Sequence, residues 1–372
     1  MMRTEQDYRP GLEGVIASKT EISFLDVDAE EIVLRGYDLI ELAKKVQYVD
    51  VIALLLDGKL PSEEEREALE EDLKADVDLP EAVLSVLNLL PQETHGMDAL
   101  RTGISALASF DEELEDRSRE ANRRKAIRLL AKVPTIIANS YRVKMKKPVV
   151  QPRKDLPYSA NFLYMLTGKV PSDSEAQAFD QSLIVYSEHE MPNSTFAARV
   201  IASTLSDFYG ALTGAVSSLK GTLHGGANEA VMKMLLEAQS KDRIEPLILE
   251  KLRNKERIMG FGHRVYMGKM DPRALLMKQA LLKLTEEKGQ SDLYEMCEIG
   301  EAVMLREKGL YPNLDYYAAP VYYLLDIPID LYTPIFLAAR TAGISAHVIE
   351  QHDHNRLFRP RIHYTGPRNL HP

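Results

Sequence analysis

Residues 219–238 read LKGTLHGGANEAVMKMLLEA and join a glycine-rich turn to a helical pattern. Val231 and Leu235 recur at helical spacing, which predicts a helix that begins near Gly226. His224 would then lie at the N-terminus of this helix, where the helix dipole favours a neutral imidazole that can donate a hydrogen bond. Taken alone, the segment also fits a histidine that only caps the turn.

Two further turns along the chain carry a polar side chain beside glycine or proline. Residues 259–266 read MGFGHRVY with His263, and residues 311–317 read YPNLDYY with Asp315. Glycines beside a polar residue indicate that the backbone passes close to something bulky. An aspartate alone is common in turns for local reasons. Two histidines and an aspartate together, however, supply what proton abstraction next to a carbonyl needs: a carboxylate base and imidazole donors for the oxygen on which charge develops.

Helical patterns cover most of the chain. Capping boxes at residues 62–65 and 172–175 begin helical patterns that we expect to run to about residues 73 and 190. In each case a glycine lies just upstream, where a preceding helix would end. ISFLDV near residue 22 and IVLRGY near residue 32 predict a small hairpin. The sequence therefore predicts an all-α protein with a small N-terminal β element.

Composition limits the classes of function. The chain has 372 residues, 45% of them hydrophobic and 27% charged, which is ordinary globular composition and long enough for two domains. Its 46 basic and 56 acidic residues give a net charge of −10, so we expect no nucleic-acid partner. The single cysteine, Cys297, lies in a helical pattern, fits a packing role and indicates a reducing compartment. No apolar leader and no run of about 18 apolar residues occurs, so we expect a cytoplasmic protein without a membrane span.

A local basic cluster departs from this acidic balance. Seven lysines and arginines lie between Lys251 and Arg273, around the glycine turn of His263. A basic cluster by itself fits a solvated face equally well. With the glycine turn in its middle, this one predicts a site for a ligand that carries several phosphates.

Two arginines occupy positions in predicted helices where a cation does not stabilise the helix. Residues 334–349 are apolar or small on nearly every side, which predicts a buried helix, yet they include Arg340. Glu350 is too far along the helix to pair with it, so a substrate carboxylate is the expected partner. Arg273 follows Asp271 in the first turn of another predicted helix, where the dipole disfavours a cation. Its placement also suggests a ligand.

Motifs spread over nearly the whole chain share one resemblance. GLEGVIASKTEIS begins at residue 11, and RPRIHYTG ends at residue 366. Between them lie RGYD, HGMDALRTGIS, EHEMPNSTFAARV, DPRA and LAARTAGISAHVIEQ, together with the three turns described above. In these motifs and their order the sequence resembles the citrate synthase family. The resemblance implies a large helical domain formed by residues 1–221 and 329–372, a small helical domain formed by residues 222–328, and an active site in the cleft between them.

The resemblance also implies a reaction and a role for each turn residue. Asp315 matches the general base that removes the α-proton of an acyl-CoA. His224 matches the residue that polarises the thioester carbonyl, and His263 matches the donor to the ketone oxygen of oxaloacetate. The implied reaction is a Claisen-type condensation followed by thioester hydrolysis. It needs no metal and no cofactor, because histidine donors take the place of a Lewis acid and the CoA thioester is a substrate.

The same resemblance assigns the binding residues. Four side chains match positions that bind oxaloacetate: His189, Arg273, Arg340 and, from the partner subunit, Arg359. We therefore expect a symmetric homodimer with shared sites. The remaining matches are CoA contacts. They comprise the backbone of Arg257, Ile258, Met259, Gly260 and Phe261, with Arg264 and Arg361 for the phosphates.

Two departures from the family pattern affect these expectations. Pro192 stands where the family commonly has an asparagine, so the backbone that aims His189 should differ locally. Ala318 replaces a common serine, which would make a pocket wall roomier and more apolar for a propionyl group. Residues 327–336, IPIDLYTPIF, resemble the methylcitrate synthases. We expect 2-methylcitrate synthase activity together with citrate synthase activity, because one methylene changes binding by only about 1 to 3 kcal/mol.

Three other functions fit parts of the sequence. The first is a citrate synthase that accepts acetyl-CoA alone. The second is a metal-dependent hydrolase, since His347, His352 and His354 lie near Glu350 in AHVIEQHDHN, although their spacing matches no recognised ligand motif. The third is a helical scaffold without activity, against which the presence of all three catalytic positions argues.

Overall fold

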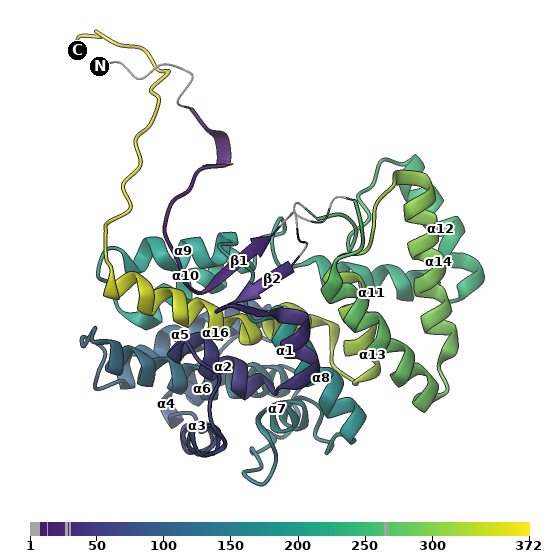
Figure 1. The fold of residues 1–372 in the computed structure, drawn as a ribbon, viewed down its shortest axis with the longest axis horizontal. Coiled ribbons are helices and arrows are strands. Elements are labelled where there is room, and N and C mark those ends of the chain that lie inside the picture. Colours follow the sequence, from purple (N-terminus) through teal and green to yellow (C-terminus); the bar gives the residue numbers. More distant parts are fainter. Residues whose placement is uncertain (1–7, 13, 27–28, 30, 264–265, 267) are drawn as a thin grey trace.

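The structure, a computed structural model, describes residues 8–372 apart from residues 13, 27–28, 30, 264–265 and 267. Helices make up most of the described chain, and a small sheet lies near its N-terminal end (Figure 1). The predicted all-α class with a small β element is confirmed. None of the described helices is both long and apolar enough to cross a membrane. The α-helices are α1 (Leu39–Lys45), α2 (Tyr48–Asp57), α3 (Glu63–Ala75), α4 (Glu81–Asn88), α5 (Gly96–Leu107), α6 (Arg119–Lys144), α7 (Tyr158–Thr167), α8 (Asp173–Tyr186), α9 (Asn193–Ala202), α10 (Phe208–Leu219), α11 (Ala227–Ala238), α12 (Lys241–Arg253), α13 (Pro272–Lys288), α14 (Ser291–Lys308), α15 (Leu314–Leu324) and α16 (Tyr332–Asp353), and the 3₁₀ helices are η2 (Pro10–Leu12), η3 (Ala108–Phe110) and η4 (Ile329–Leu331).

The sheet is antiparallel and has the strand order β1-β2-β3, with β1 at Ser23–Asp26, β2 at Glu31–Leu34 and β3 at Tyr37–Asp38. Ile32 and Leu34 lie two residues apart on β2, so their side chains point to the same face of the sheet. Both are buried, so this face packs against the hydrophobic core. The predicted hairpin is confirmed. Strand β3 is a third strand that the sequence did not indicate.

Both predicted capping boxes form. The Ser62 hydroxyl accepts a hydrogen bond from the Glu65 amide at 3.2 Å, and the Glu65 carboxylate accepts one from the Ser62 amide at 2.9 Å. Ser172 and Glu175 make the same reciprocal pair at the start of α8. These side chains satisfy backbone amides that a helix N-terminus otherwise leaves unpaired.

Helix α8 is shorter than predicted. It ends at Tyr186 and not near residue 190. Glu190 adopts a left-handed conformation with φ of 62°, and Pro192 disfavours helical backbone in the residue before it. Pro192 instead serves as the N-cap residue of α9. The short connection between the two helices holds His189.

Helix α16 lies at the centre of the larger group of helices, where it contacts α2, α6, α8, α9 and α10 (Figure 1). Every residue from Tyr332 to Ile349 is buried, which confirms the predicted buried helix. Arg340 is among them and is 2% exposed. After α16, residues 354–372 extend away from the helices (Figure 1).

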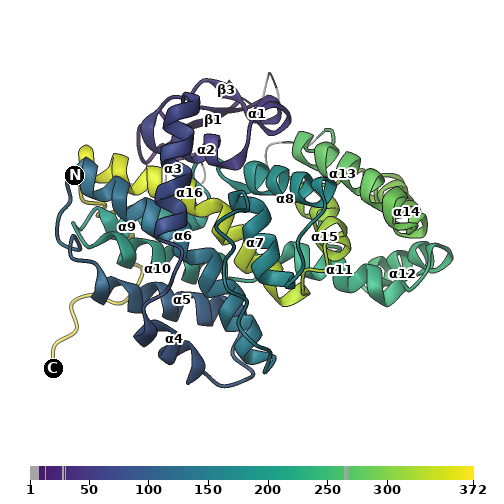
Figure 2. The same ribbon diagram turned by 90° about the horizontal axis from the view of Figure 1, so that it is seen from below.

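A second group, α11 to α15, lies at one end of the molecule in both views (Figures 1 and 2). Within it α13 packs against α15, and α12 packs against α14. These helices fall inside the small domain predicted for residues 222–328, whose boundaries stay a prediction. Helices α13 and α15 also contact α8 of the larger group, so the two groups meet there.

Candidate active site

The loops that carry His263 and Asp315 are tied together by hydrogen bonds. The Asn313 amide donates to the Gly260 carbonyl at 2.9 Å, and the Asn313 side chain donates to the Gly262 carbonyl at 3.0 Å. Asn313 is also the N-cap of α15, so one residue joins both loops to the helix. Two turns that lie about fifty residues apart in the sequence therefore form one unit.

Gly260 shows which bulky groups its loop passes. Its φ is 87°, a left-handed conformation that favours glycine. A Cβ added there would lie 2.6 Å from Val231 and 3.1 Å from Tyr316. The close neighbours are thus the protein's own side chains, and the glycine lets α11 and α15 pack against the loop.

Asp315 lies in the first turn of α15 and accepts a hydrogen bond on Oδ1 from the Tyr186 hydroxyl at 2.6 Å. Burial raises the pKa of Asp315 above its ordinary value, although the Tyr186 hydrogen bond and the Arg273 charge oppose this shift. A carboxylate with a raised pKa is a stronger base, which suits proton abstraction.

His224 is held by a residue that the sequence analysis did not single out. The Ser194 amide donates to Nε2 of His224 at 3.2 Å, and the Ser194 hydroxyl lies 2.9 Å from the same nitrogen. Because Nε2 accepts from the amide, the proton of the neutral imidazole is on Nδ1. Burial, followed by the charge of Arg340, lowers the pKa of His224 to about 4. Burial therefore accounts for the expected neutral imidazole.

His263 and His189 lie together, with ring centroids 5.1 Å apart and planes nearly perpendicular. Burial, followed by the charge of Arg273, lowers the pKa of His263 to about 4. The same two causes lower the pKa of His189 well below its ordinary value. Nε2 of His189 is buried and has no hydrogen-bond partner among the described residues. Both rings are thus neutral at pH 7 and can donate to a substrate oxygen.

Arg273 has a partner within its own helix turn. Its Nε and one terminal nitrogen donate to the two oxygens of Asp271 at 3.0 and 2.7 Å, and both side chains are buried. The sequence alone gives no structural reason for a cation at this helix N-terminus. The N-cap carboxylate of Asp271 supplies that reason, because it reaches back to the guanidinium as well as to the backbone.

Arg340 has no ion pair among the described residues. Its Nε donates to the Tyr186 carbonyl at 2.6 Å, and its guanidinium lies 4.9 Å from the centroid of the Phe336 ring. Burial lowers the pKa of Arg340 to about 10, so the group is still charged at pH 7. A buried cation with so few partners is suited to bind an anion.

Phe336 connects the parts of the site. Its ring lies 4.6 Å from that of Tyr186 and 6.4 Å from that of His224. Tyr186 in turn bonds Asp315, whose pKa responds to Arg273 and Arg340. The structure therefore brings together the following predicted residues: His189, His224, His263, Arg273, Asp315 and Arg340.

Comparison with known proteins agrees with this arrangement. The sequence model of the citrate synthase C-terminal domain matches residues 11–361. The chain belongs to the citrate synthase family. It is 62% identical to the citrate/2-methylcitrate synthase of Bacillus subtilis, over 99% of each chain, and 60% identical to a citrate synthase of Heyndrickxia coagulans, over 100% of this chain and 99% of the relative.

Solved structures of the family have the same fold. Citrate synthase from Thermoplasma acidophilum, in a ternary complex with carboxymethyl coenzyme A and oxaloacetate, is 32% identical and superposes with a TM-score of 0.91 over 98% of each chain. The enzyme from Pyrobaculum aerophilum is 36% identical, with a TM-score of 0.90 over 97% of this chain and 93% of its own.

Some residues predicted from the family resemblance lie outside the cluster. Arg359 and Arg361 are exposed on the C-terminal segment, and Arg264 lies outside the described residues. Arg257 is exposed at the start of the CoA backbone stretch, of which Ile258, Gly260 and Phe261 are buried and Met259 is partly buried. Within the described chain no ion pair involves Arg253, Lys255 or Arg257, so these cations remain available to phosphates.

The metal-site alternative is wrong for this family member. His347 is buried with Nδ1 2.8 Å from Arg199 and Nε2 3.2 Å from Glu188, which leaves neither nitrogen for a metal. His352 bonds Asn122 through Nδ1 at 3.0 Å. Among the described residues no histidine, cysteine and carboxylate groups gather with metal-site geometry. Five residues of an α-helix turn by about 140°, so His347 and His352 point to different sides of α16, and His354 is the C-cap residue beyond its end.

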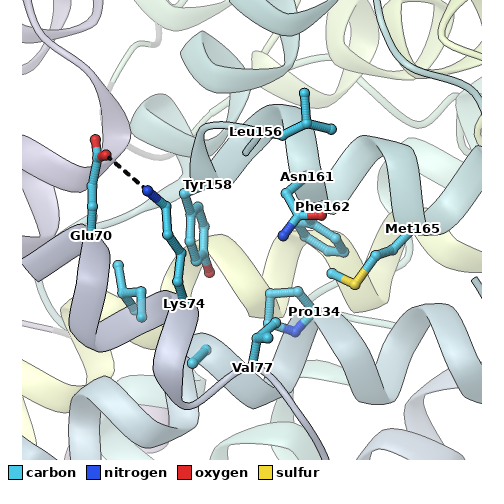
Figure 3. Close-up of a pocket in the computed structure, with 11 residues that line it drawn as sticks. Glu70, Lys74, Val77, Pro134, Leu156, Tyr158, Asn161, Phe162 and Met165 are labelled. Carbon is cyan, nitrogen blue, oxygen red and sulfur yellow. Dashed lines mark ion pairs between the residues drawn. The ribbon is translucent and has the colours of Figure 1, made fainter. Parts of the chain in front are cut away.

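A cavity elsewhere in the molecule holds none of the predicted site residues. It lies between α3, α6 and α7, has about 400 Å³ of space that is partly open to solvent, and is lined mainly by apolar side chains (Figure 3). Its charged residues, Glu70 and Lys74, pair with each other at 3.8 Å. This cavity is therefore separate from the cluster of predicted site residues around Asp315.

Proposed function

We propose that this protein condenses a short acyl-CoA, propionyl-CoA or acetyl-CoA, with oxaloacetate and water, and releases 2-methylcitrate or citrate and free CoA. The observation that carries the proposal is Arg340, a buried cation with no ion pair in the described part of the chain, which is linked through Tyr186 to a base of raised pKa, Asp315. The 62% identity to a citrate/2-methylcitrate synthase supports it.

The first step forms the enol of the acyl-CoA. Asp315 removes a proton from the carbon next to the thioester, and the electrons of that C–H bond move towards the thioester oxygen. His224 donates a hydrogen bond from Nδ1 to this oxygen, since Nε2 is occupied by Ser194. A neutral imidazole suits this role, because it donates without carrying a charge of its own.

The second step forms the carbon–carbon bond. The enol carbon attacks the ketone carbon of oxaloacetate, and the enol electrons re-form the thioester carbonyl. The ketone electrons move to the ketone oxygen, to which His263 donates a hydrogen bond, and this oxygen takes up overall the proton that left the acyl group and becomes a hydroxyl. Arg340, His189 and the terminal nitrogen of Arg273 that does not bond Asp271 hold the carboxylates, and the two cations favour the dianion. Water then hydrolyses the thioester of the condensed product, which releases CoA.

CoA is proposed to bind along the backbone from Arg257 to Phe261. The exposed cations Arg253, Lys255 and Arg257 near the end of α12 suit its phosphates. Arg264 and Arg361 complete this set in the proposal.

Each active site is proposed to need a second copy of the chain. Arg359 is exposed and lies on an extended segment that leaves the body of its own subunit (Figure 1). It would reach the oxaloacetate of the partner, which makes the enzyme a symmetric homodimer. The division into a domain of residues 1–221 and 329–372 and one of residues 222–328 would let the two close over the substrates.

Activity on both acyl-CoAs is expected, since one methylene contributes only about 1 to 3 kcal/mol. The test is CoA release by the purified protein, followed with a thiol reagent, for each acyl-CoA with and without oxaloacetate. We expect release that depends on oxaloacetate, and a product mass that identifies citrate or methylcitrate. Activity with acetyl-CoA alone would favour the strict citrate synthase.

Asp315→Asn is the matched control for this test. The amide keeps the shape of the side chain but cannot take a proton, so condensation should be lost while oxaloacetate still binds. General bases contribute about 10²- to 10⁴-fold in rate, so retention of roughly a tenth of wild-type turnover would contradict the assignment of Asp315.

A further inference from the structure

Tyr186, the last residue of α8, bonds two parts of the site at once. Its hydroxyl donates to Oδ1 of Asp315 at 2.6 Å, and its carbonyl accepts from Nε of Arg340 at 2.6 Å. The side chain is 1% exposed and its ring lies 4.6 Å from that of Phe336. A residue fixed at both polar ends and along its ring can hold two site residues at a constant separation.

The hydroxyl also makes the two oxygens of Asp315 unequal. Oδ1 is occupied by a short hydrogen bond, whereas Oδ2 has no hydrogen-bond partner among the described residues, and the side chain is only partly buried. Burial, followed by the charge of Asp315, raises the pKa of Tyr186 well above its ordinary value, so the phenol keeps its proton and remains the donor.

We propose that Tyr186 is a positioning residue for the base: it holds Oδ1 of Asp315 so that Oδ2 receives the α-proton of the acyl-CoA. In this step the C–H bond breaks, a bond forms between the proton and Oδ2, and the electron pair moves into the enol. Tyr186 itself neither gains nor loses a proton. The inference rests on the proposed function and adds to it the identity of the proton-accepting atom and the residue that selects it.

Other charged groups around Asp315 must be considered, because they set the background for its titration. From the start of α13 these are Arg273 and Asp271, and from α16 Arg340. Helix α11 contributes Glu229, which is bonded to Thr333 and paired with Lys233. These charges stay in place when Tyr186 is changed. We therefore expect the pH profile of kcat to shift and to keep its shape.

Tyr186→Phe tests the proposal, with Tyr158→Phe as its matched control. Phenylalanine keeps the ring against Phe336 and the carbonyl for Arg340, so oxaloacetate should still bind within about twofold. Tyr158 is partly buried and also donates to a carbonyl, that of Leu130 at 2.7 Å, but it lies at the cavity of Figure 3. Thermal melting of both variants reports whether each is folded.

Two kinetic readouts should change in Tyr186→Phe alone. Without the donor the pKa of Asp315 rises, so the acidic limb of the kcat profile should move to higher pH. The plateau kcat should fall about tenfold, because a small misplacement of a reacting group is costly. If Asp315 became more basic but kept its orientation, proton transfer would become faster and the plateau kcat would rise. A lower plateau kcat therefore indicates that the orientation of Asp315 is lost. The isotope effect with α-deuterated acyl-CoA should increase, since proton transfer becomes slower relative to the other steps.

The outcomes separate this inference from the proposed function. If wild type condenses acyl-CoA with oxaloacetate and Tyr186→Phe has the same plateau, pH limb and isotope effect, the positioning role is wrong while the function holds. If the plateau rises, Tyr186 only lowers the basicity of Asp315 and does not position it. If wild type fails to condense, the proposed function itself is wrong.

Discussion

Two buried arginines near α16 have opposite surroundings. Arg199 is 3% exposed and Arg340 is 2% exposed, so both are removed from water to the same extent. Arg340 has one hydrogen bond, to a carbonyl, and no ion pair among the described residues. Arg199 uses all three of its nitrogens. Its partners are Ser18, His347, Glu350 and Gln351, at 2.7 to 3.1 Å.

The surroundings of Arg199 extend into a buried network. A guanidinium cannot accept a hydrogen bond, so Nδ1 of His347 accepts from Arg199 and its proton is on Nε2. That proton is donated to Glu188 at 3.2 Å, and Glu188 also accepts from Ser23 at 2.9 Å. A cation that is so completely bonded stabilises the fold and has little capacity left for a ligand.

The difference teaches how to distinguish a structural arginine from a ligand-binding one. Burial is the same in both, and what differs is the number of partners that the protein supplies. A buried charge without partners costs stability, so it persists where a ligand provides the missing bonds. The same substitution, arginine to leucine, should therefore have opposite consequences at the two positions.

Arg340→Leu should produce the largest effect, and the effect should be on binding. Removal of a charge-assisted anchor for a substrate carboxylate costs about 2 to 5 kcal/mol or more, which is at least 10- to 10³-fold in affinity. Without ligand the variant should be about as stable as wild type, since a buried cation without an ion pair is removed while the buried Glu188 carboxylate loses a nearby opposite charge. Calorimetric titration with oxaloacetate and a denaturant titration measure both quantities. A variant that loses several kcal/mol of stability would place Arg340 in the same class as Arg199.

A third arginine, Arg359, extends the comparison to the surface. It is exposed in its own subunit, and we expect its partner to be oxaloacetate in the other subunit. Arg359→Ala and Asp315→Asn should each be inactive, yet a mixture that exchanges subunits should regain activity. About half of the dimers are then mixed, and each has one complete site of two, so recovery should approach roughly a quarter of wild type. Proven exchange without recovery would mean that Arg359 acts in its own subunit.

Arg199→Leu should show the reverse of Arg340→Leu. It leaves Oε2 of Glu350 and Nδ1 of His347 without their donor, although Oε1 of Glu350 still accepts from Thr20 and Glu21. The free energy of unfolding should therefore fall by about 3 to 5 kcal/mol. Oxaloacetate affinity of the folded fraction should stay within a few-fold of wild type. Equilibrium unfolding in urea gives the first quantity, and titration at low temperature gives the second. Loss of affinity at unchanged stability would mean that the network serves the substrate.

The sequence predicted features that depend on local pattern and failed where distant segments meet. The apolar stretch around Arg340 and the capping boxes are local, and both predictions are confirmed. The partner of His224 is Ser194, thirty residues away, and that of Asp315 is Tyr186, 129 residues away. A metal site at His347 fits the sequence as an alternative because only the fold places Arg199, 148 residues upstream, beside this histidine.

The roles of the site residues came from the family resemblance and not from the pattern. Asp315 illustrates this, because an aspartate in a turn fits a local role equally well. Arg273 illustrates the limit of rules for helix pairs. Its partner Asp271 is two residues away, outside the usual i+3 and i+4 spacings, and the contact forms only because Asp271 is the N-cap and not part of the helix.

Gln351→Met should give the smallest effect. It tests whether the stability that Arg199 contributes is divided among its several hydrogen bonds. Gln351 is 3% exposed, and its oxygen accepts from Nε of Arg199 at 3.1 Å. Methionine has a similar length, so the packing is kept, while the acceptor for Arg199 and the two bonds that the Gln351 amide donates to Asn355 and Arg356 are lost. With Ser18, His347 and Glu350 still bonded to Arg199, unfolding free energy should fall by only about 1 to 2 kcal/mol. Urea unfolding measures this change, and kcat/KM should remain within about twofold of wild type because no site residue has moved. If this variant instead lost oxaloacetate affinity as Arg340→Leu does, the two arginines would belong to one functional unit, and number of partners would no longer separate a structural cation from a substrate-binding one.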